Sequence, residues 1–544
     1  MAQIRRAIRL TVRAGVSTID GSQRRVTPSR TARNPQHEAS MRTSTPTIAS
    51  ITLAVAAAFV ADAARADVVG ISIGSDLLVD AAYGSQGYTV VNYNDEAGTW
   101  DEAVRLIPAD GGGTWMVGFH RTNANGDRVA IARLDPNGVL DTGYGDGGKQ
   151  LADTAINLVH DVILVDGRFY LTGIHYLDGG FGDAAVACVM PDGAPCAGFG
   201  DNGSVELPLN APGFNSDAAR ILHRDGALYV VGNTDPGGSS GHSSAIVVAK
   251  LDAATGALVA SFGDGSGPLA GSAVFDPNLI VDGYDFAYAA AFAANGDVLV
   301  GGSAQDDRGS RAYVLALDPA TGALDPAFGD GGYAWASLQN GVNHDDLTVR
   351  ALQVLGDGRI VAAGNANHDD EFFNTTTGVL LVSLQPGGTR TPGFGVDGLV
   401  HADIGVNLQT TDLVVRANGD LVVSTPSNGI LPNDYNSDTL QSIVQFDGAG
   451  NGPTATVSIE YPSLVLPQGW PMSMLVDASD RVLVAGFRLW DFNFPIPDSD
   501  HVVTRLVRDA IFADSFDPLM AISARRSRRR RGRRGRCRAA GRGW

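Results

Sequence analysis

Charge is scarce in this sequence, and lysine above all. Only 18% of the 544 residues are charged, and Lys149 and Lys250 are the only lysines. Arginine gathers at the two ends, with ten in residues 1–66 and eleven in residues 525–544, which leaves residues 67–524 strongly acidic. Because an acidic body repels nucleic acid and anionic membrane surfaces, neither is expected as a partner.

Long apolar runs are also missing, so the sequence offers no transmembrane segment of about 18 residues or more. The apolar run at 48–61 is followed by the small-x-small site Ala64-Arg65-Ala66, which predicts a signal peptide over 41–66. Residues 1–40 are then a mis-assigned start or a basic disordered extension, with an unusually long n-region as the alternative. We therefore expect a secreted protein, extracellular or periplasmic.

The Arg-rich tail at 513–544 is low in complexity and contains no core pattern. We expect it to be disordered, and an electrostatic anchor or a sorting signal is the alternative.

Cysteine and familiar catalytic motifs are rare. Of three cysteines, Cys188 and Cys196 flank the turn CVMPDGAPC, where a hairpin would bring them within disulfide reach. An oxidising compartment favours that disulfide, and two half-buried thiols are the alternative. The chain has neither H-E-x-x-H nor a complete P-loop, so no local motif identifies an active site.

Glycine, by contrast, is abundant, with 68 residues, and 44% of the chain is hydrophobic. Glycine at this frequency without a three-residue period excludes collagen and disfavours long helices. The hydrophobic share is large enough for a packed core, which argues against disorder of the whole chain. The composition favours many short strands joined by tight turns.

An aromatic-glycine step recurs 55 to 66 residues apart. It occurs in DTGYGDGG, GFGDNG, SFGDG, AFGDGG and GFGVDG, with a degenerate first copy AYGSQG, and the aromatic residues are Tyr83, Tyr144, Phe199, Phe262, Phe328 and Phe394. Seven hairpin patterns such as ILHRDGALYVVG join two apolar runs, six of them through an Asp-Gly or Asn-Gly turn. A third apolar run, such as AIVVAKLD, follows, so each unit offers four strands.

These units predict an all-β fold, a seven-bladed β-propeller of four-stranded antiparallel blades within 67–512. The strands are apolar on consecutive residues, which suits sheets buried on both faces. We expect the strand at 82–94 to pair in the last blade and close the fold. A linear β-solenoid is the alternative. The blades are predicted at 95–152, 153–207, 208–275, 276–337, 338–403, 404–460 and 461–509.

The repeats resemble the delta-60 repeat, a family of bacterial secreted repeat proteins thought to form propellers. The pieces that carry the resemblance are RLDPNGVLDTGYGDGG, KLDAATGALVASFGDG and ALDPATGALDPAFGDGG, each with its upstream hairpin. The sixth unit departs from the pattern, since VQFDGAGNG has no aromatic-glycine step. The resemblance implies a fold and a location, and it implies no catalytic chemistry.

Ligand-binding candidates lie in the variable loops that follow the second strand of each unit. His120 and His175 occupy equivalent positions and could bind a metal or a ligand acid, or be exposed polar residues. His368, Asp369 and Asp370 form an acidic cluster that could equally be a solvated loop. Trp490 could stack on a sugar ring or pack beneath a loop.

Metal candidates form a second set, in which an aspartate stands near the start of the first strand in six units. In a propeller these residues would surround the channel mouth and could hold a cation such as calcium, or each could cap its own loop. The Asp-rich turn DPNGVLD is a weaker calcium candidate, because Asp and Asn also favour turns. The six aspartates are Asp101, Asp161, Asp217, Asp285, Asp346 and Asp412.

The sequence thus predicts an exported, acidic, monomeric propeller that serves as a binding or scaffold module for a glycan, protein or cation, with no assigned catalysis. The alternative is a propeller enzyme, a hydrolase or lyase, with a metal-assisted site at the channel mouth.

Overall fold

The computed structural model divides the chain into two compact units, Met1–Ala58 and Phe59–Trp544, and every described residue lies in the second. The predicted signal peptide, the extension before it and the Arg-rich tail lie outside the described residues. The described ranges are 69–73, 77–93, 99–122, 126–177, 181–210, 214–235, 244–263, 265, 267–277, 279–280, 283–338, 345–369, 375–404, 409–427, 440–461, 468–491 and 498–508.

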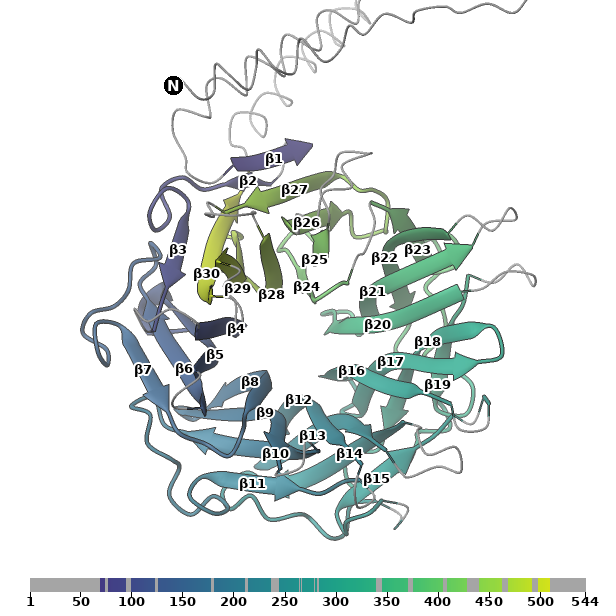
Figure 1. Ribbon diagram of the computed structural model, residues 1–544. Helices are drawn as coiled ribbons and strands as arrows, with labels where there is room; N and C mark the ends of the chain where they lie inside the picture. Colours follow the sequence, from purple (N-terminus) through teal and green to yellow (C-terminus); the bar gives the residue numbers. More distant parts are fainter. Residues whose placement is uncertain are drawn as a thin grey trace, which may run out of the picture. The chain divides into compact units, whose positions relative to one another are not determined.

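The described unit is all-β and built from four-stranded antiparallel sheets (Figure 1). The first sheet contains β4 (Thr99–Pro108), β5 (Thr114–Thr122), β6 (Gly126–Leu134) and β7 (Lys149–Ala152). The second contains β8 (Leu158–Val165), β9 (Arg168–Tyr176), β10 (Gly182–Val189) and β11 (Ser204–Leu207). The third contains β12 (Ser216–Arg224), β13 (Ala227–Thr234), β14 (Ala245–Asp252) and β15 (Ser272–Phe275).

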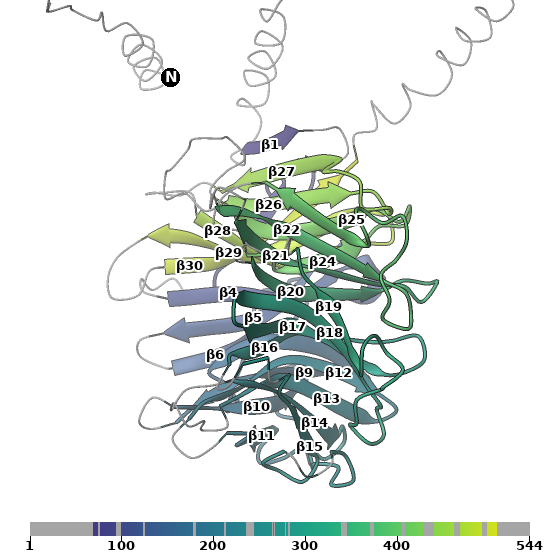
Figure 2. The same ribbon diagram turned by 90° about the vertical axis from the view of Figure 1, so that its right-hand side faces the viewer.

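Two further groups of four join into one eight-stranded sheet through a short parallel contact of β18 with β20. The first group contains β16 (Asp285–Phe292), β17 (Val298–Asp306), β18 (Gly309–Leu317) and β19 (Tyr333–Ala336). The second contains β20 (Asp345–Val354), β21 (Ile360–Asp369), β22 (Thr375–Leu384) and β23 (Leu399–Asp403). In Figure 2 β16–β18 lie beside β20–β22.

The remaining strands include three from the beginning of the described chain. β24 (Asp412–Val415), β25 (Leu421–Ser427), β26 (Leu440–Phe446) and β27 (Ala455–Glu460) pair in order, and β1 (Val69–Ile73) adds to β27. β28 (Gln468–Val476), β29 (Val482–Asp491) and β30 (Asp498–Val507) pair in order, and both β2 (Leu78–Val79) and β3 (Tyr88–Val91) pair with β30. Strand β3 therefore lies where the sequence predicted it, opposite the final strand, with Val91 across from His501.

No helix in this part of the chain is long and apolar enough to cross a membrane, since the described helix is the three-residue η1 (Asp110–Gly112).

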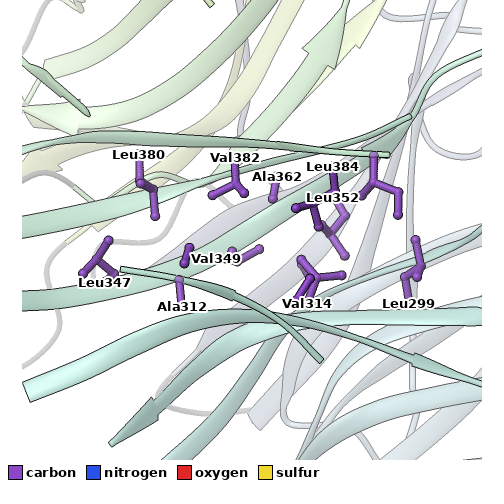
Figure 3. Packing of buried hydrophobic residues seen from close by; sticks show 14 of the residues in the cluster. Leu299, Ala312, Val314, Leu347, Val349, Leu352, Ala362, Leu380, Val382 and Leu384 are labelled. Atoms are coloured by element: carbon purple, nitrogen blue, oxygen red, sulfur yellow. The ribbon is translucent and has the colours of Figure 1, made fainter. Parts of the chain in front are cut away.

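The core lies between neighbouring sheets. Strand β10 is buried at all eight residues, as consecutive apolar residues require when both faces are covered. Figure 3 shows Leu299 and Val314 of one group facing Leu352 and Leu380 of the next. Burying apolar faces in this way contributes about 25 cal/mol for each Å² removed from water, so each sheet is stabilised by its two neighbours.

The aromatic-glycine step joins one group to the next. Phe262 is 1% exposed and lies beneath Gly322 of the following group, where a Cβ atom would come within 2.9 Å of the ring. The backbone N–H of Gly263 then donates to the carbonyl of Thr321. The same arrangement joins Tyr83-Gly84 to Asn137-Gly138, so the degenerate first copy connects β2 and β3 to the first sheet.

Candidate functional site in the central channel

The inner strands β4, β8, β12, β16, β20, β24 and β28 lie next to one another around a common centre (Figure 1). Six of them carry a β-bulge, a register shift that leaves one residue without a partner on the second strand. Opposite each bulge the second strand has a glycine, because a Cβ atom there would lie within 2 Å of a backbone oxygen; at Gly364 it would meet the Thr348 carbonyl. The recurring glycine is thus what permits the bulge.

A bulge re-aims the side chain of its extra residue. In β8, β16 and β20 the extra residues are His160, Tyr288 and Arg350. The guanidinium carbon of Arg350 lies 4.1 Å from the centre of the Tyr288 ring. The negative charge of Asp217 acts to raise the pKa of both Tyr288 and His160. Three groups of four strands therefore contribute proton-transfer and cationic groups near Asp217, with Tyr288 and Arg350 in direct contact and His160 on the neighbouring sheet.

Burial sets the ionisation of these groups. It lowers the pKa of His160, although Asp217 opposes the shift, and it raises the pKa of Tyr288, although Arg350 opposes that shift. His160 is therefore held as a neutral imidazole and Tyr288 as a phenol at neutral pH. Oδ1 of Asp217 accepts hydrogen bonds from the backbone N–H and from Nδ2 of Asn233, each at 2.9 Å.

Next to the bulge residues is a charged layer, made of Arg105, Asp161, Arg220 and Asp412. Asp161 forms an ion pair with Arg105 and also accepts the backbone N–H groups of Val162 and Ile221. Its carboxylate thereby ties the second sheet to the first and the third.

Asp412 holds the corresponding place between β24 and β28. It accepts the N–H of Leu413 at 2.8 Å and of Met474 at 2.7 Å. Burial raises the pKa of Asp412, and the nearby Arg105 lowers it.

The charged layer borders a cavity of about 400 Å³. Its walls are otherwise aliphatic, with Ile163, Leu222 and Leu352 among them, and Gln353 adds an amide. A volume of this size is typical of small-ligand sites with a few convergent polar groups.

The structure does not bring the six predicted aspartates together in one ring. Strand register separates them: Asp161 and Asp412 lie in the charged layer, Asp217 lies beside the bulge residues, and Asp101 lies opposite His120. Asp285 accepts the N–H of Gln305, and its pKa is raised to about 7 by burial and by Asp276. Asp346 is exposed and accepts from the Ser310 hydroxyl.

His120 and His175, the equivalent pair predicted from the sequence, lie beside different carboxylates. Nδ1 of the buried His120 lies 2.5 Å from Oδ1 of Asp101, and Nδ1 of His175 lies 3.0 Å from Oε1 of Glu206. The two histidines therefore make separate local contacts rather than one shared site.

The other loop candidates are only partly described. His368 and Asp369 end strand β21, and Trp490 lies near the end of β29, but their side chains are not described, and Asp370 lies outside the described residues.

Metal and disulfide candidates have definite surroundings. Across the residues that the structure describes, no three His, Cys, Asp or Glu side chains lie together as a metal site would need. In the turn DPNGVLD, Oδ1 of Asp135 accepts the N–H groups of Asn137 and Val139, so it serves the turn. Cys188 and Cys196 form a disulfide, with Cα atoms 5.3 Å apart.

Sequence reasoning named Asp161, Asp217 and Asp412 but missed the residues around them: Arg105, His160, Arg220, Tyr288 and Arg350. A usable signal existed, because each bulge residue precedes the glycine of the second strand by 13 or 14 positions. Counting back from that glycine would have found His160, Tyr288 and Arg350, and Arg105 and Arg220 are the residues that directly follow the bulge in their own units.

Comparison with known proteins supports a propeller-like fold. A family model described as a domain of unknown function (DUF5122) beta-propeller matches residues 117–144. None of the curated proteins compared with the chain is similar to it in sequence.

Solved structures with a similar fold include enzymes that act on polysaccharides. The polysaccharide lyase Uly1 is 10% identical, with a TM-score of 0.43, and the match covers 81% of this chain and 99% of that one. An ulvan lyase of family PL25, bound to -[GlcA(1-4)Rha3S]-, is 13% identical, with a TM-score of 0.43 and coverage of 77% and 96%. A thermostable family-43 glycoside hydrolase is 14% identical, with a TM-score of 0.29 and coverage of 55% and 98%.

These neighbours correct one expectation from the sequence. The prediction of a binding or scaffold module with no assigned catalysis is contradicted by these comparisons, in which the similar solved structures are lyases and glycoside hydrolases. The likeness itself concerns the fold, so the catalytic groups have to be argued from this chain's own residues.

Proposed function

We propose that this chain is an enzyme that cleaves a polysaccharide, with His160, Tyr288 and Arg350 in the active site. The observation that carries the proposal is the contact of Arg350 with the Tyr288 ring at 4.1 Å, near Asp217, whose charge acts on both Tyr288 and His160. General acid–base catalysis needs proton-transfer groups at a fixed position, and these come from rigid inner strands rather than from loops.

Elimination fits this site better than hydrolysis does. Glycoside hydrolysis ordinarily uses two carboxyl groups, one of them a proton donor. Here Asp161, Asp217 and Asp412 are each held by N–H donors or by an arginine. In elimination, a neutral His160 would take the proton from the carbon next to the sugar's acid group, the glycosidic C–O bond would break to leave a C=C bond, and Tyr288 would protonate the leaving oxygen.

Arg350 has the complementary task in this reaction. As the proton leaves, negative charge develops on the acid group of the sugar, and a fixed guanidinium stabilises that charge. The stabilisation is stronger in a buried site than in water.

The test is an assay of the full chain on acidic and neutral polysaccharides, with ultraviolet absorbance for unsaturated ends and a reducing-end assay for any cleavage. We expect unsaturated products, and at least about 100-fold slower turnover for Tyr288→Phe and for His160→Gln. His175→Gln is the matched control and should keep full activity. Reducing ends without unsaturation would make the enzyme a hydrolase, and no cleavage of any polymer would refute the proposal.

The finer features of the fold belong to the same proposal: seven blades, closure by the first strands, and kinship with the delta-60 repeat. Support comes from the pairing of β3 with β30 and from the hydrogen bond of Gly84 to Asn137. We also propose that the protein is monomeric. We further propose that it acts outside the cytoplasm, a location that the predicted signal peptide and the Cys188–Cys196 disulfide support.

A further inference from the structure

The wall of the channel cavity carries more positive than negative charge, although the body of the chain is strongly acidic. With Arg350, the cavity wall holds three arginines, Arg105, Arg220 and Arg350, and two carboxylates, Asp161 and Asp412. Asp161 is committed to Arg105 and to two backbone N–H groups. The other carboxylate, Asp412, lies near Arg105 and Arg220, so one positive charge of the cavity wall has no carboxylate to balance it.

Arg220 and Arg350 form no ion pair with a carboxylate among the described residues. Nη1 of Arg220 donates to its neighbour's carbonyl, that of Ala219, at 2.8 Å. Arg350 lies over Tyr288, and with the Gln409 amide oriented so that its oxygen faces the guanidinium, that oxygen accepts from Nη1 and Nη2 at 3.1 and 2.8 Å. Nε of Arg350 is buried and has no hydrogen-bond partner.

An excess positive charge in such a buried place is costly unless an anion pairs with it. Burying a charge without a counter-charge is unfavourable, and burial lowers the pKa of both Arg220 and Arg350. The Arg220 side chain also reaches the Arg350 backbone, because Nη2 of Arg220 donates to the Arg350 carbonyl at 3.5 Å. One anion at this point could reach both side chains.

We propose that Arg220 and Arg350 bind a single oxyanion, a carboxylate or a sulfate, carried by a sugar-sized ligand in the channel cavity. The fork of N–H donors on arginine matches the oxygens of such groups, and the cavity of about 400 Å³ has room for a sugar residue. The inference rests on the proposed function in taking the anion to be the acid group of the substrate. Binding of the anion itself, however, requires no turnover.

The experiment is calorimetric titration of the full chain with glucuronate, glucose and inorganic sulfate. We expect glucuronate to bind and glucose, which has the same ring without the acid group, not to bind. Binding of sulfate as well as glucuronate would support recognition of oxyanions in general, and binding of glucuronate alone would support a carboxylate site. Absence of binding by both anions, or equal binding of glucose, would overturn the proposal.

Variants locate the site. Arg350→Gln and Arg220→Gln should each weaken glucuronate binding by at least tenfold, and Arg350→Lys should retain part of it. The matched control is Arg359→Gln, because Arg359 pairs with Asp357 in an exposed turn of the same sheet. Unchanged affinity in both channel variants would refute the assignment. If a variant does not fold, the melting temperature of the unmodified chain is measured instead. A rise with glucuronate but not with glucose would support the anion site, and no rise with glucuronate would contradict it.

Failure here can be told apart from failure of the proposed function. If anions bind at Arg220 and Arg350 but no polysaccharide is cleaved, the enzyme proposal fails and this inference stands. If a neutral polysaccharide is cleaved and no anion binds, the enzyme proposal stands and this inference fails.

Discussion

At the scale of single residues, the channel depends on one carboxylate that serves three partners. Asp161 pairs with Arg105 and accepts two backbone N–H groups, one of them from the neighbouring sheet. The side chain of Asp161 is 4% exposed and that of Arg105 is 27% exposed, so solvent screens the pair only in part.

We expect Asp161→Asn to lower the free energy of unfolding by about 2 kcal/mol, because it leaves a partly buried arginine without its partner. Asp153→Asn is the control, since Asp153 is 83% exposed in its pair with Arg128 and should change stability by less than about 0.5 kcal/mol. Urea unfolding of both variants measures the difference, and equal effects would show that the layer has no special role.

His501 gives the chain a stability that depends on pH. The residue is fully buried between β30 and β5, with Asp101 and His120 nearby, and burial lowers its pKa from 6.5 to about 4. The unfolded chain therefore binds the proton more readily than the folded chain between these values.

The contribution of His501 to stability is complete above pH 6.5 and is lost as the pH falls toward 4, by up to about 3 kcal/mol. Burial raises the pKa of Glu102 to about 7, so the contribution of Glu102 to stability falls as the pH rises, opposite to that of His501. The effect of His501 is therefore the difference in pH dependence between the chain and a variant that lacks this histidine. Unfolding measured across this range for the chain and for His501→Gln should differ in slope, and parallel curves would contradict the assignment.

At the scale of elements, the repeat motif has a definite task. Its aromatic residue fills the space beneath a glycine of the next group, and its glycine N–H donates to the same turn. The motif that the sequence marked most clearly is therefore a connection between sheets, which explains why it recurs with the blade period.

Gly322→Ala should destabilise the chain by about 3 kcal/mol, through backbone strain at its φ of 75° and the clash with Phe262. Gly331→Ala is matched to it, because Gly331 has a φ of 60° and an open surrounding, so only about 1 kcal/mol is expected. Thermal unfolding of the two variants separates packing from strain, and an equal loss would show that the aromatic contact is unimportant.

At the scale of the whole described unit, the first and last strands are held together by one arginine. Arg505 of β30 pairs with Asp80, donates to the Pro136 carbonyl of the first sheet and lies 4.6 Å from the ring of Tyr83. It thus connects the last sheet, the segment that precedes β3 and the first sheet.

Arg505→Gln should cost about 3 kcal/mol and should speed hydrogen exchange at residues 88–91, because the buried Asp80 contact is broken where the first strands join the last sheet. Arg481→Gln is the control, since Arg481 pairs with Asp477 inside a single turn. Unchanged exchange in strand β3 would argue against this role for Arg505.

The predictions made from the sequence differ from the structure at the inner strands. The hairpins and the step at Phe262 follow from local turn chemistry and from a period that the chain itself displays. The positions of the predicted aspartates do not, because they stand on different sides of the bulges. Asp161 directly follows the bulge of β8, as Arg105 follows that of β4, whereas Asp101 precedes the bulge of β4 and lies opposite His120.

The sequence by itself determined the strands, their grouping in fours and the pairing of the opening segment with the final strand, since these rest on apolar runs, turn residues and repetition. Only the tertiary structure decided which side chains meet at the centre. Arg350 lies over Tyr288, and His160 and Tyr288 both lie near Asp217, although these residues are far apart in the chain. Their positions depend on bulges that glycines on the adjacent strands permit. A local pattern records how a strand forms, whereas a site made of single residues from several sheets exists only after those sheets have packed.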